Sequence, residues 1–323
     1  MTPKRVRDFR FDSCGLIVLA PLLAAPFATA NPLYFSLTNQ IVVGVIASLA
    51  VYIMLRMNLL SFTVPTFMAV GGYTAAMIST HGVTNLLVLL AGAFVMPVLI
   101  AVPLGVLVLR LKGVYFIFFT FILNEVTQVM LFETPDLTGG SNGISGIPPV
   151  TFFGIPLGQQ NYLVLVTVIT GIVAAAATLA VTQRFRAEFA AIDENETLAE
   201  SVGVAVWKYR TIGFVASAGI AGLGGFAIVN QLSTAHPSEF TSFSAINYVA
   251  YAFVGGKGTM LGSVVGATLL ILMSNYFSSQ GAYASALFGL LLMSVVMAAP
   301  GGIVGEIRQF FEKRSQARRG SAK

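Results

Sequence analysis

Long apolar stretches without a charged residue recur along the chain and constrain its fold more than any other feature. The stretch Leu86–Leu109 is one example. An apolar run of about 18 residues or more is typical of a helix that spans a bilayer. Only 10% of the 323 residues are charged, whereas a soluble domain carries about 25%. The sequence therefore excludes a soluble enzyme, a secreted disulfide scaffold and a disordered chain. Because the runs do not alternate apolar and polar residues, it also disfavours a β-barrel.

These stretches predict an all-α integral membrane protein with about ten transmembrane helices. Ten helices of about 20 residues use roughly 200 residues and leave only loops between them. The eighth stretch is too short to cross alone, so we expect it to continue into the preceding polar residues or to break and re-enter. The predicted spans are Cys14–Ala30, Tyr34–Leu55, Leu60–Ser79, Leu86–Leu109, Val114–Leu131, Tyr162–Val181, Thr211–Asn230, Ala245–Gly255, Leu261–Asn275 and Ala282–Ala299.

The charged residues test this map independently. With the N-terminus in the cytoplasm, all 18 lysines and arginines fall on the cytoplasmic side, and the outer loops hold Glu133, Asp136 and Glu239 and no basic residue. A wrong number of spans would scatter basic residues over both sides. This distribution also explains the net charge of +5 better than nucleic-acid binding does. We predict one domain, residues 1–323, with cytoplasmic termini 1–13 and 306–323 and a large cytoplasmic loop 183–210.

The first span has an alternative interpretation. A basic segment, an apolar stretch and Ala28-Thr29-Ala30 together resemble a signal peptide with its cleavage site. Cleavage would leave the topology of the remaining spans unchanged.

Ten spans divide into two halves of five, and an odd number per half makes the two halves run in opposite directions through the membrane. Many transporters have such inverted repeats. Phe67-Met68-Ala69-Val70-Gly71-Gly72 resembles Tyr251-Ala252-Phe253-Val254-Gly255-Gly256, and the two segments run in opposite directions. The sequence therefore predicts a 5+5 inverted repeat.

The glycines within the spans allow two structural roles. Small residues let membrane helices approach closely, and this interpretation fits Gly222, Gly224 and Gly225. Glycine also permits a helix to break. Gly255, Gly256 and Gly258, which flank a single lysine, favour such a break at the cytoplasmic edge.

Glu125 is the only carboxylate inside a predicted span, and Asn124 precedes it. An ionisable group in lipid is costly and usually faces a bundle interior or water. The pair is therefore a candidate lining of a transport path or a proton site. The alternative is a structural hydrogen bond between helices.

The outer loop after the fifth span contains Thr138, Gly139, Gly140, Ser141 and Asn142. Its glycines permit tight turns, and free N–H groups with serine and asparagine side chains would suit a polar ligand. We therefore treat these residues as a candidate substrate path or gate, with an ordinary polar turn as the alternative.

The largest inner loop predicts a short amphipathic helix, Ala190–Val204, that ends at a glycine. Such a helix is either solvated or docked into the groove of a partner.

The chain lacks the motifs of a resident cofactor or metal. Gly255-Gly256-Lys257-Gly258-Thr259 superficially resembles a phosphate-binding loop, but glycine follows the lysine where serine or threonine is needed. His81 and His236 are far apart, Cys14 is the only cysteine, and no cluster has metal-ligand spacing. Energy for uphill transport must therefore come from another subunit or an ion gradient.

From about Gly44 onward the sequence resembles the second (M-type) permease subunits of bacterial ABC importers for branched-chain amino acids. Leu137–Pro148, with its Thr-Gly-Gly-Ser-Asn-Gly core, is the most specific match. The other matching segments are Leu59–Phe62, Gly71–Ala76, Gly113–Glu125, Ala190–Gly203 and Gly222–Gly225, with Gly255, Gly256, Gly262 and Gly266.

This resemblance implies an inner-membrane transport subunit that is not itself an enzyme. It implies a second permease, a periplasmic binding protein, and two cytoplasmic ATPase subunits that bind ATP and magnesium. It also implies that the inner loop contacts those ATPases, through Ala190, Asp193, Glu194, Glu200 and Gly203, and that the imported substrate is a hydrophobic amino acid.

Two residues depart from the family pattern. Asp193 stands where the family often has arginine, and Gln128 stands where a basic residue often follows the glutamate. These departures leave the ATPase contact and the substrate open. Importers for urea, short amides or other organic acids share the scaffold, and fold alone does not fix a substrate. An ion-coupled secondary transporter remains the alternative from a different class. A membrane-embedded enzyme is disfavoured, because one carboxylate without a partner base is a poor catalytic set.

Overall fold

The computed structural model describes residues 32–152, 155–157, 160–256, 258–278, 283–298 and 302–305. The predicted first span, its possible cleavage site, Lys257 and the segments 1–13 and 306–323 lie outside the described residues.

Each predicted span from the second to the tenth coincides with a helix. Helices are favoured because a bilayer offers no partner for unpaired backbone groups. These helices are α2 (Pro32–Leu55), α3 (Val64–Thr80), α4 (Leu86–Val108), α5 (Val114–Glu133), α7 (Gln160–Arg184), α10 (Val206–Leu232), α11 (Ser242–Gly255), α12 (Met260–Ser278) and α13 (Ala284–Ala298).

Six of these helices, α2, α4, α5, α7, α10 and α12, are long and apolar enough to cross a bilayer. The chain is therefore a multi-pass membrane protein. Helices α3, α11 and α13 are shorter, with 17, 14 and 15 residues. The eighth span does extend into the polar residues before it, because α11 begins at Ser242 and follows the 3₁₀ turn η2 (Pro237–Phe240). The total of ten spans stays a prediction.

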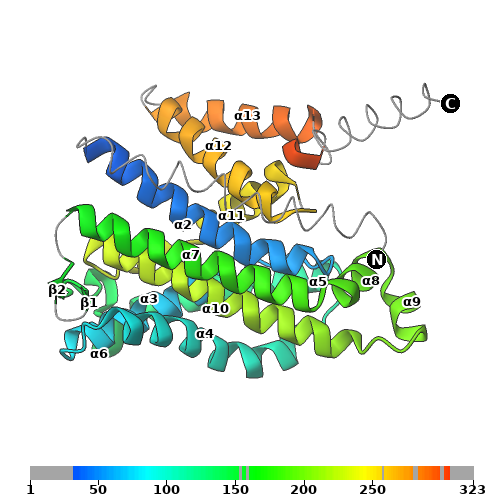
Figure 1. The fold of residues 1–323 in the computed structure, drawn as a ribbon, viewed down its shortest axis with the longest axis horizontal. Helices are drawn as coiled ribbons and strands as arrows, with labels where there is room; N and C mark the ends of the chain where they lie inside the picture. Colours follow the sequence, from blue (N-terminus) through cyan, green and yellow to red (C-terminus); the bar gives the residue numbers. More distant parts are fainter. Residues whose placement is uncertain are drawn as a thin grey trace.

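Helices α2 and α10 form the centre of the bundle. Their apolar windows are 89% and 78% buried within the chain, compared with 33% for α4 and 17% for α5. Helix α7 packs on both central helices, so that α2, α7 and α10 lie side by side (Figure 1). Helices that are apolar on all sides belong in such an interior.

The outer helices pack on the central pair in a crossed pattern. Helices α3 and α4, from the first half of the chain, pack on α10 of the second half. Helices α11 and α12, from the second half, pack on α2 of the first half. Figure 1 shows α4 and α12 on opposite sides of the central layer.

Glycines permit the closest of these contacts. Gly225 of α10 lies against the carbonyl oxygen of Met68 in α3, and Gly71 of α3 lies against the backbone of Gly222. A Cβ atom at Gly225 would collide with that backbone. The expected packing role is confirmed for Gly222 and Gly225, and it explains why small residues recur where membrane helices meet.

The glycines at the end of α11 divide into two roles. Gly256 has a φ of 113° and ends the helix, so the expected break is confirmed there. Gly255, however, lies against the backbone of Gly262 in α12. It therefore provides close packing between the two helices.

The helices alternate between two ends of the molecule. At one end, which we call the loop end (residues 81–85, 134–152, 155–157 and 233–241), the amide of Thr151 donates to Thr84 O at 2.8 Å and Ile144 pairs with Ala235. At the other, the basic end (residues 56–63, 109–113, 185–205, 256 and 258–259), Arg56 donates to the Gly258 carbonyl at 3.5 Å. This alternation agrees with the predicted path of the described spans.

Short elements complete the two ends. At the loop end these are α6 (Pro135–Thr138), the 3₁₀ turn η1 (Gly140–Asn142) and the antiparallel strands β1 (Thr151–Phe152) and β2 (Ile155–Pro156), in which Thr151 pairs with Pro156 and Phe152 with Ile155; at the basic end they are α8 (Arg186–Glu194) and α9 (Glu196–Ser201).

Candidate functional site

Helix α5 is held to the bundle along one narrow edge. Its buried residues, Phe116, Thr120 and Asn124, recur every four positions and therefore lie on one stripe of the helix. The Thr120 hydroxyl accepts a hydrogen bond from the Phe62 amide at 3.2 Å. The other residues of α5 are half-buried or exposed within this chain.

Asn124 ties α5 to two other helices. Its side chain is 1% exposed. The Thr66 hydroxyl of α3 donates to its Oδ1 at 3.0 Å, and its Nδ2 donates to the Ser242 hydroxyl of α11 at 2.9 Å. Asn124 therefore fixes the position of α5 through interhelical hydrogen bonds.

Glu125 follows Asn124 and lies on the exposed part of α5. Its surroundings on that face are mostly apolar and include the exposed Phe118, Ile122 and Val129. Within the described part of the chain, Glu125 has no hydrogen-bonding or ionic partner. An ionisable group in the middle of a transmembrane helix is costly against lipid. This face is therefore suited to contact with water or with another protein.

Thr138 closes the end of α5 nearest the loop end. Its hydroxyl contacts the carbonyl oxygens of Leu131 and Thr134 at 2.6 and 2.7 Å, and the amide of Gly140 donates back to it at 3.2 Å. Gly139 and Gly140 have φ values of 76° and 57°, which favour glycine.

The amides of the loop Thr138–Ile144 are mostly used within the protein. Those of Gly139 and Gly143 donate to the carbonyls of Pro135 and Gly140, and that of Ile144 donates to Ala235 at 2.9 Å. The expected set of free N–H groups is therefore wrong for these positions. The exposed side chains of Ser141 and Asn142 remain available at this surface.

A histidine that the sequence analysis did not select fastens this loop. The amide of Ser238 donates to Nδ1 of His236 at 3.2 Å, so Nε2 carries the hydrogen and donates to the Ser141 carbonyl at 2.9 Å. His236 thus joins the loop after α5 to the loop after α10. The two segments are far apart in sequence, and no local pattern predicts the contact.

The cytoplasmic-loop prediction needs a correction, because the segment is two helices instead of one. Helix α8 ends at Glu194, and Asn195 adopts an extended conformation with φ −162° and ψ 113°. Its side chain accepts from the Leu198 amide at 3.0 Å and caps α9. Asparagine favours such an N-cap over a helix interior, so the helix restarts there. Of the predicted contact residues, Ala190, Asp193 and Glu194 lie on α8, Glu200 lies on α9, and Gly203 follows with a φ of 88°.

Glu196 anchors α9 to the bundle. Both carboxylate oxygens accept hydrogen bonds from Arg210 of α10, at 2.8 and 2.9 Å, and Lys112 lies 3.2 Å from one of them. Burial alone would raise the pKa of Glu196, but the hydrogen bonds from Arg210 and Lys112 and their charges outweigh it and hold the pKa below its ordinary value of 4.5. Sequence analysis missed this cluster because its residues come from three separate segments.

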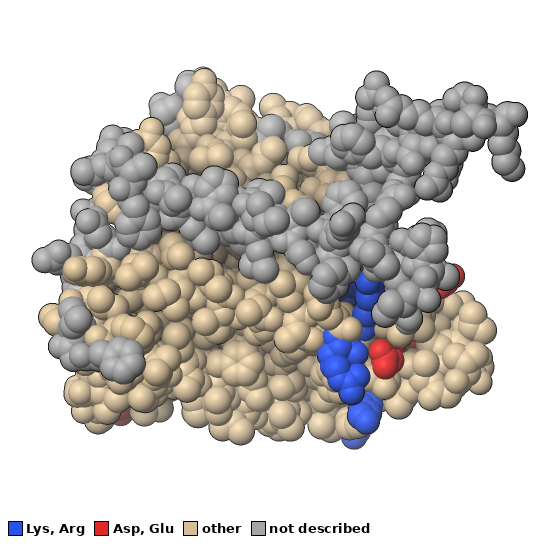
Figure 2. Space-filling view, viewed as in Figure 1, with Lys and Arg blue, Asp and Glu red and all other residues tan. Residues whose placement is uncertain are grey.

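The basic end also exposes apolar side chains. Leu198, Val202 and Trp207 are 60%, 70% and 56% exposed. Leu198 lies on α9, Val202 directly follows α9, and Trp207 lies in the first turn of α10. Figure 2 shows lysines, arginines and acidic residues gathered at the end where α8 and α9 lie in Figure 1. Exposed apolar groups with a charged rim are typical of a protein interface.

The predicted site residues form two groups at different ends. The path residues lie along α5 and in the loop at the loop end, and the contact residues lie in α8, α9 and the following turn at the basic end. Among the described residues, no group of three or more His, Cys, Asp or Glu side chains is placed to hold a metal ion.

Comparison with known proteins finds that this chain is similar to membrane permeases. Residues 33–298 match the family described as "Branched-chain amino acid transport system / permease component". The high-affinity branched-chain amino acid transport system permease protein LivM of Escherichia coli K12 is 23% identical over 79% of this chain and 65% of its own length. The match thus spans less than two thirds of LivM.

A permease named for a different substrate also matches. The ribose import permease protein RbsC of E. coli K12 is 27% identical over 87% of this chain and 88% of its own length. No solved structure matches. Because the family match covers most of the chain, this protein belongs to the family of permease components of branched-chain amino acid transport systems.

Proposed function

We propose that this chain is the membrane subunit of an ABC importer that moves hydrophobic, branched-chain amino acids into the cytoplasm. Family membership supports the permease role, and the LivM relatives support the substrate class. ATP hydrolysis takes place on two partner ATPase subunits, which bind ATP and magnesium, and a periplasmic binding protein delivers the substrate. The chain itself is not an enzyme and works in the inner membrane.

The observation that carries the transport role is Glu125 on the exposed, mostly apolar face of α5. Such a face is unsuited to lipid because of its carboxylate. A second permease subunit that packs against α4 and α5 would cover the apolar part and leave a water-filled path beside Glu125. Asn124 then positions the helix, and Ser141 and Asn142 stand where the path meets the outer surface.

The crossed packing supports the proposed 5+5 inverted repeat. A repeat that exchanges α2 with α10, α3 with α11 and α4 with α12 reproduces the observed contacts of α3 and α4 with α10 and of α11 and α12 with α2. Gly44-Val45-Ile46-Ala47-Ser48 in α2 also resembles Gly213-Phe214-Val215-Ala216-Ser217 in α10. Two such halves can exchange inward-open and outward-open arrangements around one path.

We assign the basic end to the cytoplasm, in line with the positive-inside distribution. There the exposed Leu198, Val202 and Trp207 would contact an ATPase subunit, and the ion pair of Glu196 with Arg210 would transmit movement of α9 to the central helix α10. ATP shifts the equilibrium between the inward-open and outward-open states only if the contact with the ATPase subunit differs between these two states.

The match to RbsC favours one second candidate, import of a sugar. Urea, short amides and other small organic acids remain further substrates for the same machinery. These candidates are separated by measuring whether excess unlabelled leucine, ribose or urea suppresses the uptake of a labelled substrate.

A pull-down of the tagged chain from its native host in mild detergent tests the proposal. We expect mass spectrometry to identify ATPase and second-permease chains that co-purify. A chain that repeatedly purifies alone and catalyses gradient-driven uptake in liposomes would overturn the importer and favour an ion-coupled secondary transporter.

A further inference from the structure

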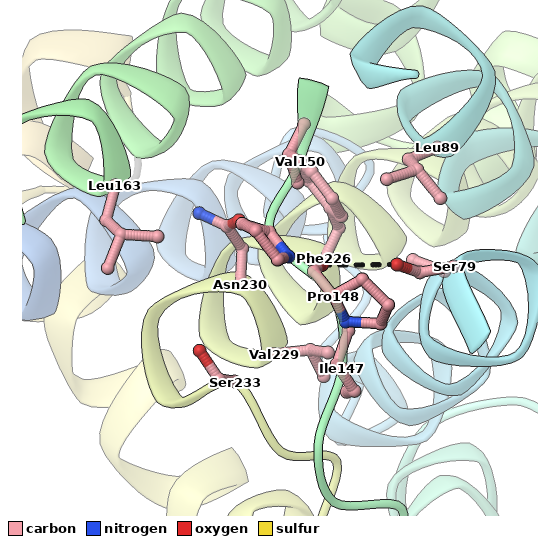
Figure 3. Close-up of a pocket in the computed structure, with 12 residues that line it drawn as sticks. Ser79, Leu89, Ile147, Pro148, Val150, Leu163, Phe226, Val229, Asn230 and Ser233 are labelled. Atoms are coloured by element: carbon pink, nitrogen blue, oxygen red, sulfur yellow. Dashed lines mark hydrogen bonds between the residues drawn. The ribbon is translucent and has the colours of Figure 1, made fainter. Parts of the chain in front are cut away.

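A cavity of about 200 Å³ lies near the loop end, between α4 and α7 (Figure 3). Phe226 and Val229 of α10 form part of its wall, and the segment around Val150 closes another side. The cavity is partly open to the surface. None of the proposed path residues lines it, so it is separate from the proposed substrate path.

The walls are apolar except for a few neutral groups, and no described lining residue is charged. Leu89 of α4 and Leu163 of α7 face each other across the cavity (Figure 3). The Ser79 hydroxyl is already used, because it donates to the Pro148 carbonyl at 3.3 Å. A zwitterionic amino acid would find no charged partner here, so the cavity does not suit the proposed transport substrate.

Among the described lining residues, Asn230 supplies the one buried side-chain donor that has no partner. Its side chain is 7% exposed, and its Nδ2 has no hydrogen-bonding partner among the described residues. In Figure 3 this amide points into the cavity from α10. Buried amide groups nearly always have a partner, so this donor indicates an acceptor that occupies the cavity.

The depth of the cavity in the membrane narrows the chemistry of that acceptor. Ser79 is one residue from the end of α3, Asn230 is two residues from the end of α10, and Leu163 lies in the first turn of α7. One turn from the helix ends is where the hydrocarbon core gives way to the polar part of a bilayer. The ester carbonyls of lipids lie at this level.

Water alone fits this cavity poorly. An apolar cavity of about 150 Å³ stays dry and binds benzene instead. A volume of about 200 Å³, in which Asn230 is the one described lining residue with a buried and unpaired side-chain donor, gives a cluster of waters few buried partners. An apolar chain with one acceptor satisfies both the walls and the donor.

We propose that this cavity binds an alkyl or acyl chain that carries a neutral carbonyl or hydroxyl oxygen, with that oxygen accepting a hydrogen bond from Nδ2 of Asn230. Membrane phospholipids and free medium-chain esters or alcohols share this chemistry. The proposal depends only on the placement of the chain in a membrane and is independent of the transported substrate.

Two variants of the full chain test the site, and a third variant serves as a matched control. Asn230→Leu removes the donor at similar volume, and Leu163→Trp fills the cavity from α7. Asn275→Leu is the control, because Asn275 lies at a similar depth in α12, outside the cavity, and bonds to Gln40 at 3.0 Å.

Native mass spectrometry of the detergent-purified chains measures retained phospholipid, and melting temperatures with and without octyl acetate measure binding of a free amphiphile. We expect binding of at least one probe to fall about tenfold in Asn230→Leu, the effect of one hydrogen bond, and to be lost in Leu163→Trp. Asn275→Leu should behave as the unmodified chain.

The two probes distinguish the source of the ligand. Retained phospholipid assigns it to the bilayer, and stabilisation by octyl acetate alone assigns it to a free amphiphile. Equal binding in all four proteins overturns the proposal. The proposal is also overturned if neither probe binds and Asn230→Leu is at least as stable as the unmodified chain.

Discussion

At the residue scale, Asn124 and Glu125 are neighbours with different roles. Asn124 is buried and bonded to Thr66 and Ser242, whereas Glu125 is exposed on an apolar face. Their positions on a helix differ by about 100°, which separates a side chain that holds α5 in place from one that faces outward. The sequence alone predicts that the pair is important, but the division of roles depends on which edge of α5 packs against the bundle.

The change Glu125→Gln should lower the initial rate of substrate uptake about tenfold or more, because a carboxylate that faces the path would lose its charge. Assembly of the complex should be unaffected. Glu133→Gln is the matched control, since Glu133 is an exposed carboxylate at the end of the same helix. Uptake at the normal rate by Glu125→Gln would remove this residue from the path.

The ion pair between Glu196 and Arg210 should hold α9 against α10. Glu196→Gln removes the charge, and we expect a local loss of about 1 kcal/mol, since hydrogen bonds to charged groups are worth about 1.5–3 kcal/mol and this site is partly exposed. Amide hydrogen exchange in residues 196–204 should therefore rise several-fold at pH 7. Glu200→Gln, on the same helix, should leave exchange unchanged.

The same ion pair should depend on pH in a defined direction. The pKa of Glu196 is lower in the fold than its ordinary value of 4.5, so the stabilisation is present at neutral pH and is lost as the pH falls below 4.5 through the folded pKa. Exchange in α9 of the unmodified chain should then approach that of Glu196→Gln. An unchanged difference between the two proteins at acidic pH would contradict the role assigned to the carboxylate.

At the scale of elements, the spans from the second to the tenth were predictable because long apolar runs dictate membrane helices. The segment between α7 and α10 was predicted to contain one continuous helix, but the helix breaks at Asn195. Its amphipathic period continues through Asn195, and only the capping bond to Leu198 reveals the restart. The hydrogen-bond network at the loop end could not be predicted from the sequence either. The contact of His236 with Ser141 joins segments that only the folded bundle brings together.

The glycine contact between α3 and α10 gives a prediction at this scale. Gly225→Ala places a Cβ atom against the backbone at Met68, and we expect a loss of about 1–3 kcal/mol, as for other overpacked sites. Gly289→Ala in α13 is the control, because its Cβ would meet no atom within 4 Å. A lowered melting temperature in both variants, or in neither, would contradict the close packing of α3 on α10.

At the scale of the whole molecule, the basic end and the loop end must face opposite compartments. In a chain with Cys14→Ser, we expect an impermeant maleimide to label Ser141→Cys in cells with a permeabilised outer membrane. Ser201→Cys should be labelled only after the inner membrane is also opened. Both positions are exposed in the structure. Labelling of both residues from the same side would contradict the alternation of the helices.

The central claim is that this chain imports substrate only as part of an ATP-driven complex. The most direct measurement is uptake of labelled leucine into liposomes that contain the purified complex, with ATP trapped inside and the binding protein outside. We predict uptake that requires both ATP and the ATPase subunits and that excess unlabelled isoleucine suppresses. Uptake by this chain alone, driven by an ion gradient and indifferent to ATP, would contradict the account.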